Sequence, residues 1–443
     1  MSDDAKLVLI AIGCLLIAGV IYVVYIAEIF KIDFTSPETK ADPKLIEKLI
    51  LNPEQKVRMF ISLENTTAEQ LEAQGIKVIK TGKYANYAVV EGNYSVLSKL
   101  IANPDVKYVY EDGVVKAIDI PVKPVIQDED WNVEAIKANI AHENGITGQG
   151  AVIAVVDTGV NHRLPDLSGN YIGGYDFVYN DSEPDDVCGH GTKVASVAVA
   201  KGERKTGVAP EAKYFAVKVL NDQCWGNWSD VIAGLEWILE KVESGEKIDV
   251  VSMSLGASIA PRELEIICNK LRDKGVILVA VSGNENSPNS LYPAAYDSVI
   301  SVGAVDINLN VARFSNGGAD VAAPGVQVFV LSNDGNLYLA DGTSIATPHV
   351  SAVLALVESR KDISPAEAFE LLKTSTDEIN DPDNKVKYGQ INAVKAVNNA
   401  LNLTIPENPK NWFDYVYEPQ IQIVIGLVIL ALGMKVIGSG RRD

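Results

Sequence analysis

The chain has 443 residues, a length that allows two or three domains. Apolar residues make up 47% of it, as in a globular protein with some membrane-embedded sequence. The formal net charge of −19 argues against a nucleic-acid partner, because binding to phosphates requires positive charge. The four cysteines form no CxxC pair, which argues against a zinc site and against a disulfide-rich scaffold.

An apolar, uncharged stretch near the N-terminus predicts a transmembrane helix over residues 7–30. The segment from Leu7 to Ile26 is long enough to cross the hydrocarbon core as a helix. A cleaved signal peptide is the alternative, but its apolar core would be too long and the residues before it are not basic. We therefore expect a retained membrane anchor.

Residues 31–54 are polar and contain two prolines, so we expect a linker with one short helix. Residues 55–117 follow the order β-α-β-β-α-β, which is that of a ferredoxin-like unit. This pattern predicts a small α+β domain and by itself says nothing about the role of that domain. The predicted strands are 57–61, 76–79, 87–90 and 106–110, and the predicted helices are 67–74 and 94–102.

Residues 118–130 contain prolines and aspartates, and we expect a connector that is exposed to cleavage. Over residues 131–403 strands then alternate with helices, which predicts an α/β domain with a parallel sheet. The predicted strands are 152–156, 214–219, 250–253, 276–281 and 299–302, and the predicted helices are 191–200, 229–241, 261–274, 344–359, 365–373 and 392–401.

Near the C-terminus, residues 404–418 form a predicted juxtamembrane linker that is rich in aromatic side chains, and residues 419–437 form a second predicted transmembrane helix. A buried amphipathic helix is the alternative for this second segment. Two spans would place both termini on the same side, and Arg441 and Arg442 indicate that this side is the cytoplasm. The predicted location is thus the cell membrane, with residues from about 30 to 418 outside the cytoplasm.

Four polar side chains stand at predicted strand ends or helix starts. Asp157 ends the strand VIAVVD, and Asn284 follows the strand VILVAV, where an amide can donate to an oxyanion. His190 stands between two glycines at a helix start. Ser344 stands where helical periodicity begins, and a serine hydroxyl becomes a nucleophile only when a base takes its proton.

Each of these motifs has an ordinary explanation when it is taken alone. Asp-Thr-Gly is a common turn, and it also occurs in aspartic proteases, which need a second such carboxylate that this chain lacks. A lone histidine is usually structural, and a turn asparagine needs no function. Gly-Thr-Ser is an ordinary start of a helix. The four residues therefore indicate a function only in combination.

The four motifs are DTG at 157–159, GHGT at 189–192, SGN at 282–284 and GTSIATP at 342–348. Together, and in this order, they closely resemble the signatures of the subtilisin-like serine proteases, and the resemblance runs from about residue 131 to residue 401. It implies a three-layer α/β fold with a mainly parallel sheet, and hydrolysis of peptide or protein substrates without a cofactor. It also implies a catalytic triad of Asp157, His190 and Ser344, with Asn284 in the oxyanion hole.

By the same resemblance, residues 55–117 look like the inhibitory propeptide of the family. Such a propeptide blocks the cleft with its C-terminal segment until the chain is cut, here somewhere within residues 118–130. A permanent interaction domain is the alternative. The substrate would bind as an added β-strand along Ser254, Leu255 and Gly256.

Resemblance also indicates the subsites of the predicted cleft. Residues 226–228 would form its opposite wall, from Gly226 to Trp228, with the indole in an apolar pocket, and Ser282 and Gly283 are further substrate-binding residues. Leu291 would lie at the base of the S1 pocket and make it shallow. We therefore expect a preference for small or medium apolar P1 residues.

Several positions depart from the family pattern. Lys193 replaces the usual second histidine, and Ile345 replaces the methionine after the nucleophile. The segment Lys201 to Thr206 is short and basic where many relatives have a calcium loop. Calcium needs a cage of oxygen ligands, so this departure argues against a calcium site at that position. A structural calcium ion stays possible, and Asp181 to Asp186 is the alternative place for it.

The resemblance places Cys188 and Cys224 beside the same subsite, so we expect a disulfide between them, and two free thiols are the alternative. Cys268 is expected in the core. The leading interpretation is a membrane-anchored endopeptidase made as an autoinhibited precursor. A catalytically silent binding protein with the same fold, and a processing protease with a single partner, are the alternatives.

Overall fold

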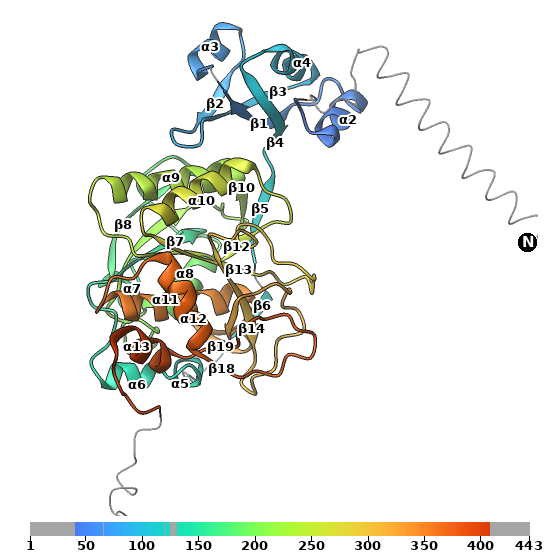
Figure 1. The fold of residues 1–443 in the computed structure, drawn as a ribbon. Helices are drawn as coiled ribbons and strands as arrows, with labels where there is room; N and C mark the ends of the chain where they lie inside the picture. Colours follow the sequence, from blue (N-terminus) through green and yellow to red (C-terminus); the bar gives the residue numbers. More distant parts are fainter. Residues whose placement is uncertain (1–39, 65, 119, 125–130, 408–443) are drawn as a thin grey trace, which may run out of the picture.

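A small α+β domain precedes a larger α/β domain in the computed structural model, which describes residues 40–64, 66–118, 120–124 and 131–407 (Figure 1). Within these residues, the sheet of the small domain is antiparallel with the strand order β2-β3-β1-β4. This confirms the β-α-β-β-α-β order predicted from the sequence. The elements of the small domain are α2 (Pro43–Leu51), β1 (Val57–Leu63), α3 (Ala68–Ala73), β2 (Val78–Thr81), β3 (Tyr87–Gly92), α4 (Tyr94–Ala102) and β4 (Val106–Glu111).

The helix α2 was predicted as part of a linker over residues 31–54, but it packs into the core of the small domain. Its apolar side chains Leu45, Ile46 and Leu49 are buried in the same cluster as the sheet residues. Ala41, just before the helix, forms a parallel bridge with Val109 of β4. The small domain therefore begins earlier than predicted, because the apolar face of a short helix needs a surface to cover it.

The larger domain alternates strands with helices as predicted, and each of its six predicted helices is present within two residues at either end. The strands that were not predicted are short or rich in small residues, so they lack a clear apolar period. Its elements are α5 (Trp131–Ala135), α6 (Ala138–Glu143), β7 (Val152–Asp157), α7 (Pro165–Ser168), β8 (Tyr171–Asp176), α8 (His190–Val199), β9 (Lys213–Lys218), β10 (Trp225–Asn227), α9 (Trp228–Glu243), β11 (Val250–Met253), β12 (Leu255–Gly256), α10 (Arg262–Asp273), β13 (Ile277–Val281), β14 (Ile300–Val305), β15 (Val321–Pro324), β16 (Val328–Leu331), β17 (Leu337–Asp341), α11 (Thr343–Glu358), α12 (Pro365–Thr374), β18 (Thr376–Asp377), β19 (Gln390–Ile391) and α13 (Ala393–Leu401).

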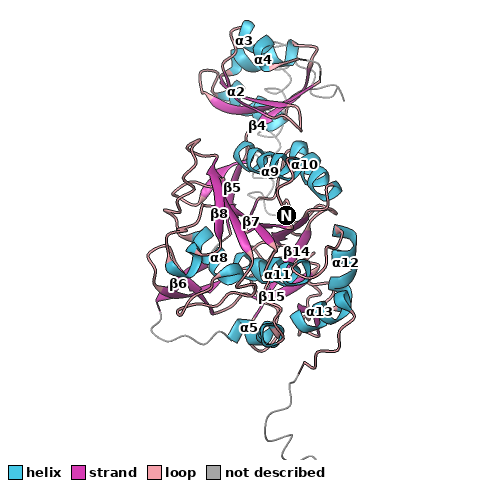
Figure 2. Cartoon of the chain, turned by 90° about the vertical axis from the view of Figure 1, so that its left-hand side faces the viewer, coloured by secondary structure: helices cyan, strands magenta, loops and turns pink. Residues whose placement is uncertain are grey.

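The large sheet lies between two layers of helices. Within the described residues its order is β18-β19-β15-β14-β13-β11-β7-β9-β8, and every pair but β18 with β19 is parallel. Figure 2 shows α8 and α11 on one side of this sheet and α9 and α10 on the other. Alternate residues of β7 enter opposite cores: Ile153 and Val155 pack with α8 and α11, whereas Ala154 and Val156 pack with α9 and α10. A strand covered on both faces must be continuously apolar, as VIAVV is. The predicted three-layer α/β fold is confirmed.

The end of the predicted propeptide and the start of the predicted connector both pair with strands of the larger domain. Strand β5 (Val114–Ala117) lies between β10 and β12, antiparallel to both. Strand β6 (Ile120–Pro124) pairs with β17, which also pairs with β16. In Figure 1 the chain descends through β5 from the small domain into the larger one. The Pro- and Asp-bearing sequence of residues 118–130 did not indicate this backbone pairing, which satisfies hydrogen-bonding groups of residues 120–124.

The predicted transmembrane helices at 7–30 and 419–437 lie outside the described residues, as does most of the predicted linker at 404–418. Between residues 40 and 407, no helix of the described chain has the length and apolar character needed to cross a membrane.

Glu358, the last residue of α11, is a buried carboxyl with an altered proton affinity. Burial raises the pKa of Glu358 to about 7, and the nearby carboxylates of Asp249 and Asp362 add to the rise. Lys247 lies close to both of these carboxylates, 3.3 Å from Asp249 and 3.5 Å from Asp362. A negative charge at the C-terminal end of a helix is also unfavourable to the helix dipole.

We predict that Glu358→Gln stabilises the protein at alkaline pH. Because the pKa of Glu358 is raised in the folded state, the carboxyl stabilises the fold below its ordinary value near 4.5 and loses that contribution as pH rises through about 7. The gain above pH 8 should be on the order of 2–3 kcal/mol, since one pKa unit corresponds to about 1.4 kcal/mol. Urea unfolding from pH 4 to pH 9 in the Ser344→Ala background measures it.

The gain should vanish below about pH 4.5, where the carboxyl is protonated in both states. Glu370→Gln is the matched control, because Glu370 is exposed and pairs with Lys373 on the surface. Equal unfolding midpoints for Glu358→Gln and the parent at pH 8.5 would contradict the prediction.

Candidate active site

The carboxylate and the imidazole that the sequence singles out are in direct contact. Asp157 ends β7, and His190 is the first residue of α8, after Gly189 with a φ of 89°. The Nδ1 atom of His190 lies 2.7 Å from Oδ1 of Asp157, and both side chains are buried. Because an ionised carboxylate only accepts hydrogen bonds, the shared proton belongs to Nδ1. This contact fixes the tautomer in which Nε2 is the basic nitrogen.

Asp186 holds the two loops that carry this pair, and the sequence analysis missed that role. Its Oδ1 accepts hydrogen bonds from Thr158 Oγ1 (2.8 Å) and from the Gly189 N–H (2.6 Å). Its Oδ2 accepts from the N–H and the hydroxyl of Thr192, at 2.8 and 2.6 Å. Burial raises the pKa of Asp186, while these hydrogen bonds favour its charged form. An acidic residue four positions before a helix start was the available signal.

Ser344 is the second residue of the buried helix α11, and that helix contains Pro348. A proline has no N–H, so the carbonyl of Ser344, four residues earlier, has no helical donor. Ser254, which precedes β12, supplies one: its hydroxyl donates to the Ser344 carbonyl at 2.8 Å. The strand expected to bind substrate therefore also holds the helix that carries the serine.

Asn284 and Ser344 lie on either side of Gly342, where a larger residue would crowd both side chains. Thr343 donates to Oδ1 of Asn284 from its N–H (3.0 Å) and from its hydroxyl (2.9 Å), which orients the amide. Gly342 has a φ of 144°, and a Cβ added there would lie 2.9 Å from Ser344 Oγ and 3.2 Å from Asn284 Nδ2. Within the part of the chain that the structure describes, Nδ2 is buried and has no hydrogen-bond partner. A donor without a partner in such a place suits an oxyanion.

The two predicted walls of the cleft face each other across β5. Gly226 of β10 pairs with Val115, and Gly256 of β12 pairs with Lys116, both in antiparallel register. Beside them, the Ala117 N–H donates to the carbonyl of Cys224 at 3.0 Å. The structure thus pairs Asp157 with His190, places the predicted amide donor beside Ser344 and fills the predicted cleft with an extended strand.

Comparison with known proteins agrees with this geometry. Residues 148–395, more than half of the chain, match the subtilase family. The chain belongs to the subtilase family. It is a subtilisin-like serine endopeptidase and acts on peptide or protein substrates.

The subtilase is similar to several bacterial enzymes. It is 37% identical over 311 residues to the thermophilic serine proteinase of Bacillus sp. (strain AK1), covering 68% of this chain and 75% of that protein. It is 36% identical over 299 residues to subtilisin E of Bacillus subtilis (strain 168), covering 66% and 75%. It is 36% identical over 282 residues to thermitase of Thermoactinomyces vulgaris, covering 62% and 99%.

A solved structure shows the same fold. The crystal structure of an epidermin leader peptide processing serine protease from Staphylococcus aureus matches with a TM-score of 0.69 and 22% identity, over 78% of this chain and all of that chain. At this identity the likeness supports the fold alone.

The remaining subsite residues of the subtilase lie around β5. Trp228 is buried in the same cluster as Val115, and its Nε1 donates to the carbonyl of Ile259 at 2.9 Å. Leu291 and Val281 pack with Ile118, and the Leu291 N–H donates to the Ser282 carbonyl at 2.8 Å. The indole thus lies in the cluster that includes Val115 of β5, and Leu291 packs against Ile118, the residue after β5.

The subtilase contains a disulfide between Cys188 and Cys224, the pair that the sequence analysis expected. It joins the loop before His190 to the loop before β10, so it spans two sides of the cleft. Cys268 is free and buried among the apolar residues that α10 contributes to the core, as expected. Burial raises the pKa of the Cys268 thiol, which makes this sulfur a poor nucleophile.

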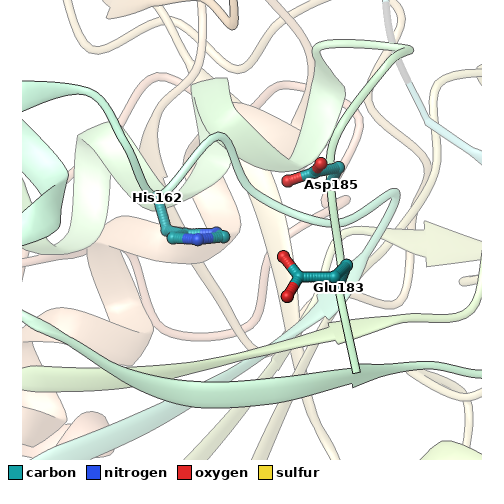
Figure 3. Close-up of side chains that lie close together, drawn as sticks. All are labelled: His162, Glu183 and Asp185. Carbon is teal, nitrogen blue, oxygen red and sulfur yellow. The ribbon is translucent and has the colours of Figure 1, made fainter. Parts of the chain in front are cut away.

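The acidic stretch from Asp181 to Asp186, named as an alternative calcium site, contains one possible ligand group. The ligand atoms of His162, Glu183 and Asp185 lie within 4.8 Å of one another (Figure 3). Arg163, however, pairs with both carboxylates, at 3.1 Å from Glu183 and 2.5 Å from Asp185. The guanidinium already balances this negative charge, so the group is a weak candidate for a calcium ion.

Two further histidines, His349 and His142, make contacts within the fold. His349 is fully buried on α11, with Nδ1 2.9 Å from the Ile345 carbonyl and Nε2 2.9 Å from Nδ2 of Asn132. Burial lowers the pKa of His349 to about 3, so the ring stays neutral. Nε2 of His142 lies 2.8 Å from the Val208 carbonyl, and burial lowers the pKa of His142.

We predict that Asn284→Leu lowers kcat of the processed enzyme by about 10²–10³ and leaves KM nearly unchanged, because the amide donates only to the oxyanion of the transition state. The size of this effect is the one measured when an asparagine donor was removed from subtilisin, a member of the same family. Steady-state kinetics with a chromogenic peptide measures it.

Thr343→Val is the control for orientation alone. It removes one of the two hydrogen bonds to Oδ1 and keeps the Nδ2 donor, so its loss of kcat should be smaller. A loss below tenfold for Asn284→Leu would show that this amide does not stabilise the transition state.

Proposed function

We propose that the chain is the autoinhibited precursor of a membrane-anchored serine endopeptidase that works through an acyl-enzyme on Ser344. The observation that carries the autoinhibition is β5, which fills the cleft between β10 and β12. The proposed peptide hydrolysis uses only groups of this chain, together with water, and no cofactor.

In the proposed reaction, Ser344 Oγ attacks the carbonyl carbon of the scissile bond while His190 Nε2 takes its proton. The same nitrogen then gives the proton to the leaving amine, and water hydrolyses the acyl-enzyme in a second, similar cycle. Asp157 keeps the ring in the required tautomer and stabilises the imidazolium, which the 2.7 Å contact supports. Asn284 Nδ2 and the Ser344 N–H stabilise the oxyanion.

The small domain is proposed to act as the propeptide. Glu236 of α9 accepts hydrogen bonds from the N–H groups of Tyr84 (2.8 Å) and Ala85 (3.1 Å), which belong to the loop before β3. Lys80 pairs with Asp230 of the same helix, and Lys83 contacts Glu240 at 3.0 Å. These contacts seat the small domain on α9, and Figure 2 shows this domain above α9 and α10.

Buried polar contacts extend this interface to α10. Ser62 and Tyr110 of the small domain both hydrogen-bond to Glu263 of α10. Arg58 contacts Ser229 Oγ at 2.9 Å and Asp112 at 3.1 Å. An interface built from buried charges and hydrogen bonds sets one orientation of the small domain, and that orientation delivers β5 to the cleft.

We predict that a fluorophosphonate probe labels the full-length wild-type protein at one serine and does not label Ser344→Ala. We also expect the wild type to cut itself near the end of the propeptide, so that its measured mass decreases. The Ser344→Ala protein should stay intact. Labelling and intact mass are read by mass spectrometry on the purified full-length chain.

Three outcomes separate the parts of this proposal. Label together with a cut supports a self-processing serine protease. Label without a cut keeps the enzyme and removes the propeptide role. No label on folded protein from which the propeptide has been cut away would contradict the acyl-enzyme on Ser344.

The proposed membrane anchoring is supported by sequence alone, through the apolar segments 7–30 and 419–437. If the chain is cut after β5, the first segment separates from the catalytic domain and the second keeps the mature enzyme at the membrane. The catalytic domain would then act outside the cytoplasm, with both termini of the precursor inside.

We predict that the Ser344→Ala precursor stays in the membrane pellet after carbonate extraction and needs detergent for release. Deleting either segment alone should leave it in the pellet, and deleting both should release it. Release of the intact precursor by carbonate would contradict the anchoring.

A further inference from the structure

The chain that fills the cleft has a definite register against the active-site residues. Ala117 pairs with Leu255 of β12, and the next residue, Ile118, donates its N–H to the carbonyl of Ser254 at 3.3 Å. Beyond it, Ile120 of β6 pairs with Asp341, three residues before Ser344. The backbone is therefore paired at residues 117 and 118 and again at residue 120.

The carbonyl oxygen of Ile118 lies beside the same glycine, Gly342, as the nucleophile and the amide donor. A Cβ added to Gly342 would be 3.4 Å from this oxygen, 2.9 Å from Ser344 Oγ and 3.2 Å from Asn284 Nδ2. The three atoms thus surround one small volume that only a glycine leaves open. The nucleophile, the amide donor and the carbonyl of Ile118 therefore all border the same glycine.

The side chain of Ile118 fills a short pocket that Leu291 closes. Ile118 is 7% exposed and packs with Val281 and Leu291. A Cδ atom of Leu291 lies 3.3 Å from the position of a Cβ at Gly256 and 2.9 Å from that of a Cβ at Gly283. Leu291 therefore occupies the slot between the two glycine-bearing segments that form the pocket walls. A deeper pocket would need a smaller residue at this position.

From these contacts we infer that the precursor cuts itself first between Ile118 and Asp119, and that Leu291 restricts the S1 pocket to short aliphatic P1 side chains such as that of Ile118. The inference rests on the proposed function and adds the bond and the residue that selects it. The serine Oγ bonds to the carbonyl carbon of Ile118 and the bond to the nitrogen of Asp119 breaks. That nitrogen leaves as an amine with the proton from His190, and water then releases the Ile118 carboxylate and restores Ser344.

The first test is the new N-terminus of the purified full-length protein. The wild type should yield a chain that begins at Asp119, and Ser344→Ala should yield none. A fluorophosphonate-labelled protein whose first cut lies at another bond would overturn the inference and leave the proposed function standing. Failure to label folded protein from which the propeptide has been cut away would instead overturn the proposed function.

The second test pairs substitutions at the two contacting positions. Ile118→Phe should slow the first cut by about tenfold or more, because the aromatic ring does not fit above Leu291. Adding Leu291→Gly should restore cutting of the Ile118→Phe chain. Folding of each variant is checked by thermal unfolding in the Ser344→Ala background. Equal cutting rates for Ile118→Phe and the wild type, with Leu291 present, would overturn the role of Leu291.

Peptide substrates then test the same pocket in the processed enzyme. On Val-Lys-Ala-Xaa p-nitroanilides, the wild type should have a higher kcat/KM for Xaa = Ile or Val than for Phe, and Leu291→Gly should reverse that order. Ile307→Gly is the matched control, since it removes an exposed aliphatic side chain that is not among those packed with Ile118 and should leave the preference unchanged. Dominant cleavage after Phe or Lys by the wild type would overturn the inferred pocket.

Discussion

One buried hydrogen bond, from the imidazole of His190 to the carboxylate of Asp157, sets the requirements that the rest of the site meets. Burying a carboxylate is costly unless it accepts hydrogen bonds, and here the ring and the Thr158 N–H both donate to Oδ1 of Asp157. Asp186 ties the loop after Asp157 to the start of α8, so neither partner can drift from the other. The parallel sheet provides the rigid strand end on which this pair is built.

The nucleophile depends on a second, less usual link. Pro348 removes one hydrogen bond from the helix of Ser344, and the hydroxyl of Ser254 replaces it. Ser254 also presents its carbonyl to the N–H of Ile118 in the cleft. One residue therefore connects the position of the serine to the strand that receives a peptide backbone. A shift of this strand on binding would act directly on the helix start that carries the nucleophile.

The cleft is occupied through the backbone, by strand pairing on both sides of the site. Main-chain pairing accepts many sequences, so we expect selectivity to come from the side chains packed against this strand, among them Trp228 and Leu291. The disulfide between Cys188 and Cys224 spans the loop before His190 and the loop whose carbonyl meets the Ala117 N–H. A covalent link at this point limits how far the wall can move from the histidine.

The α/β class, the helices of the larger domain and the four polar residues at strand ends and helix starts could all be predicted from the sequence, because apolar periodicity and local motifs are properties of neighbouring residues. The small domain was recognised from its strand and helix order for the same reason. The role of Asp186, the inward packing of α2 and the pairing of residues 114–124 with β10, β12 and β17 became visible only in the folded chain. These features depend on contacts between segments far apart in the sequence, and buried backbone and carboxylate groups must find partners wherever the fold places them.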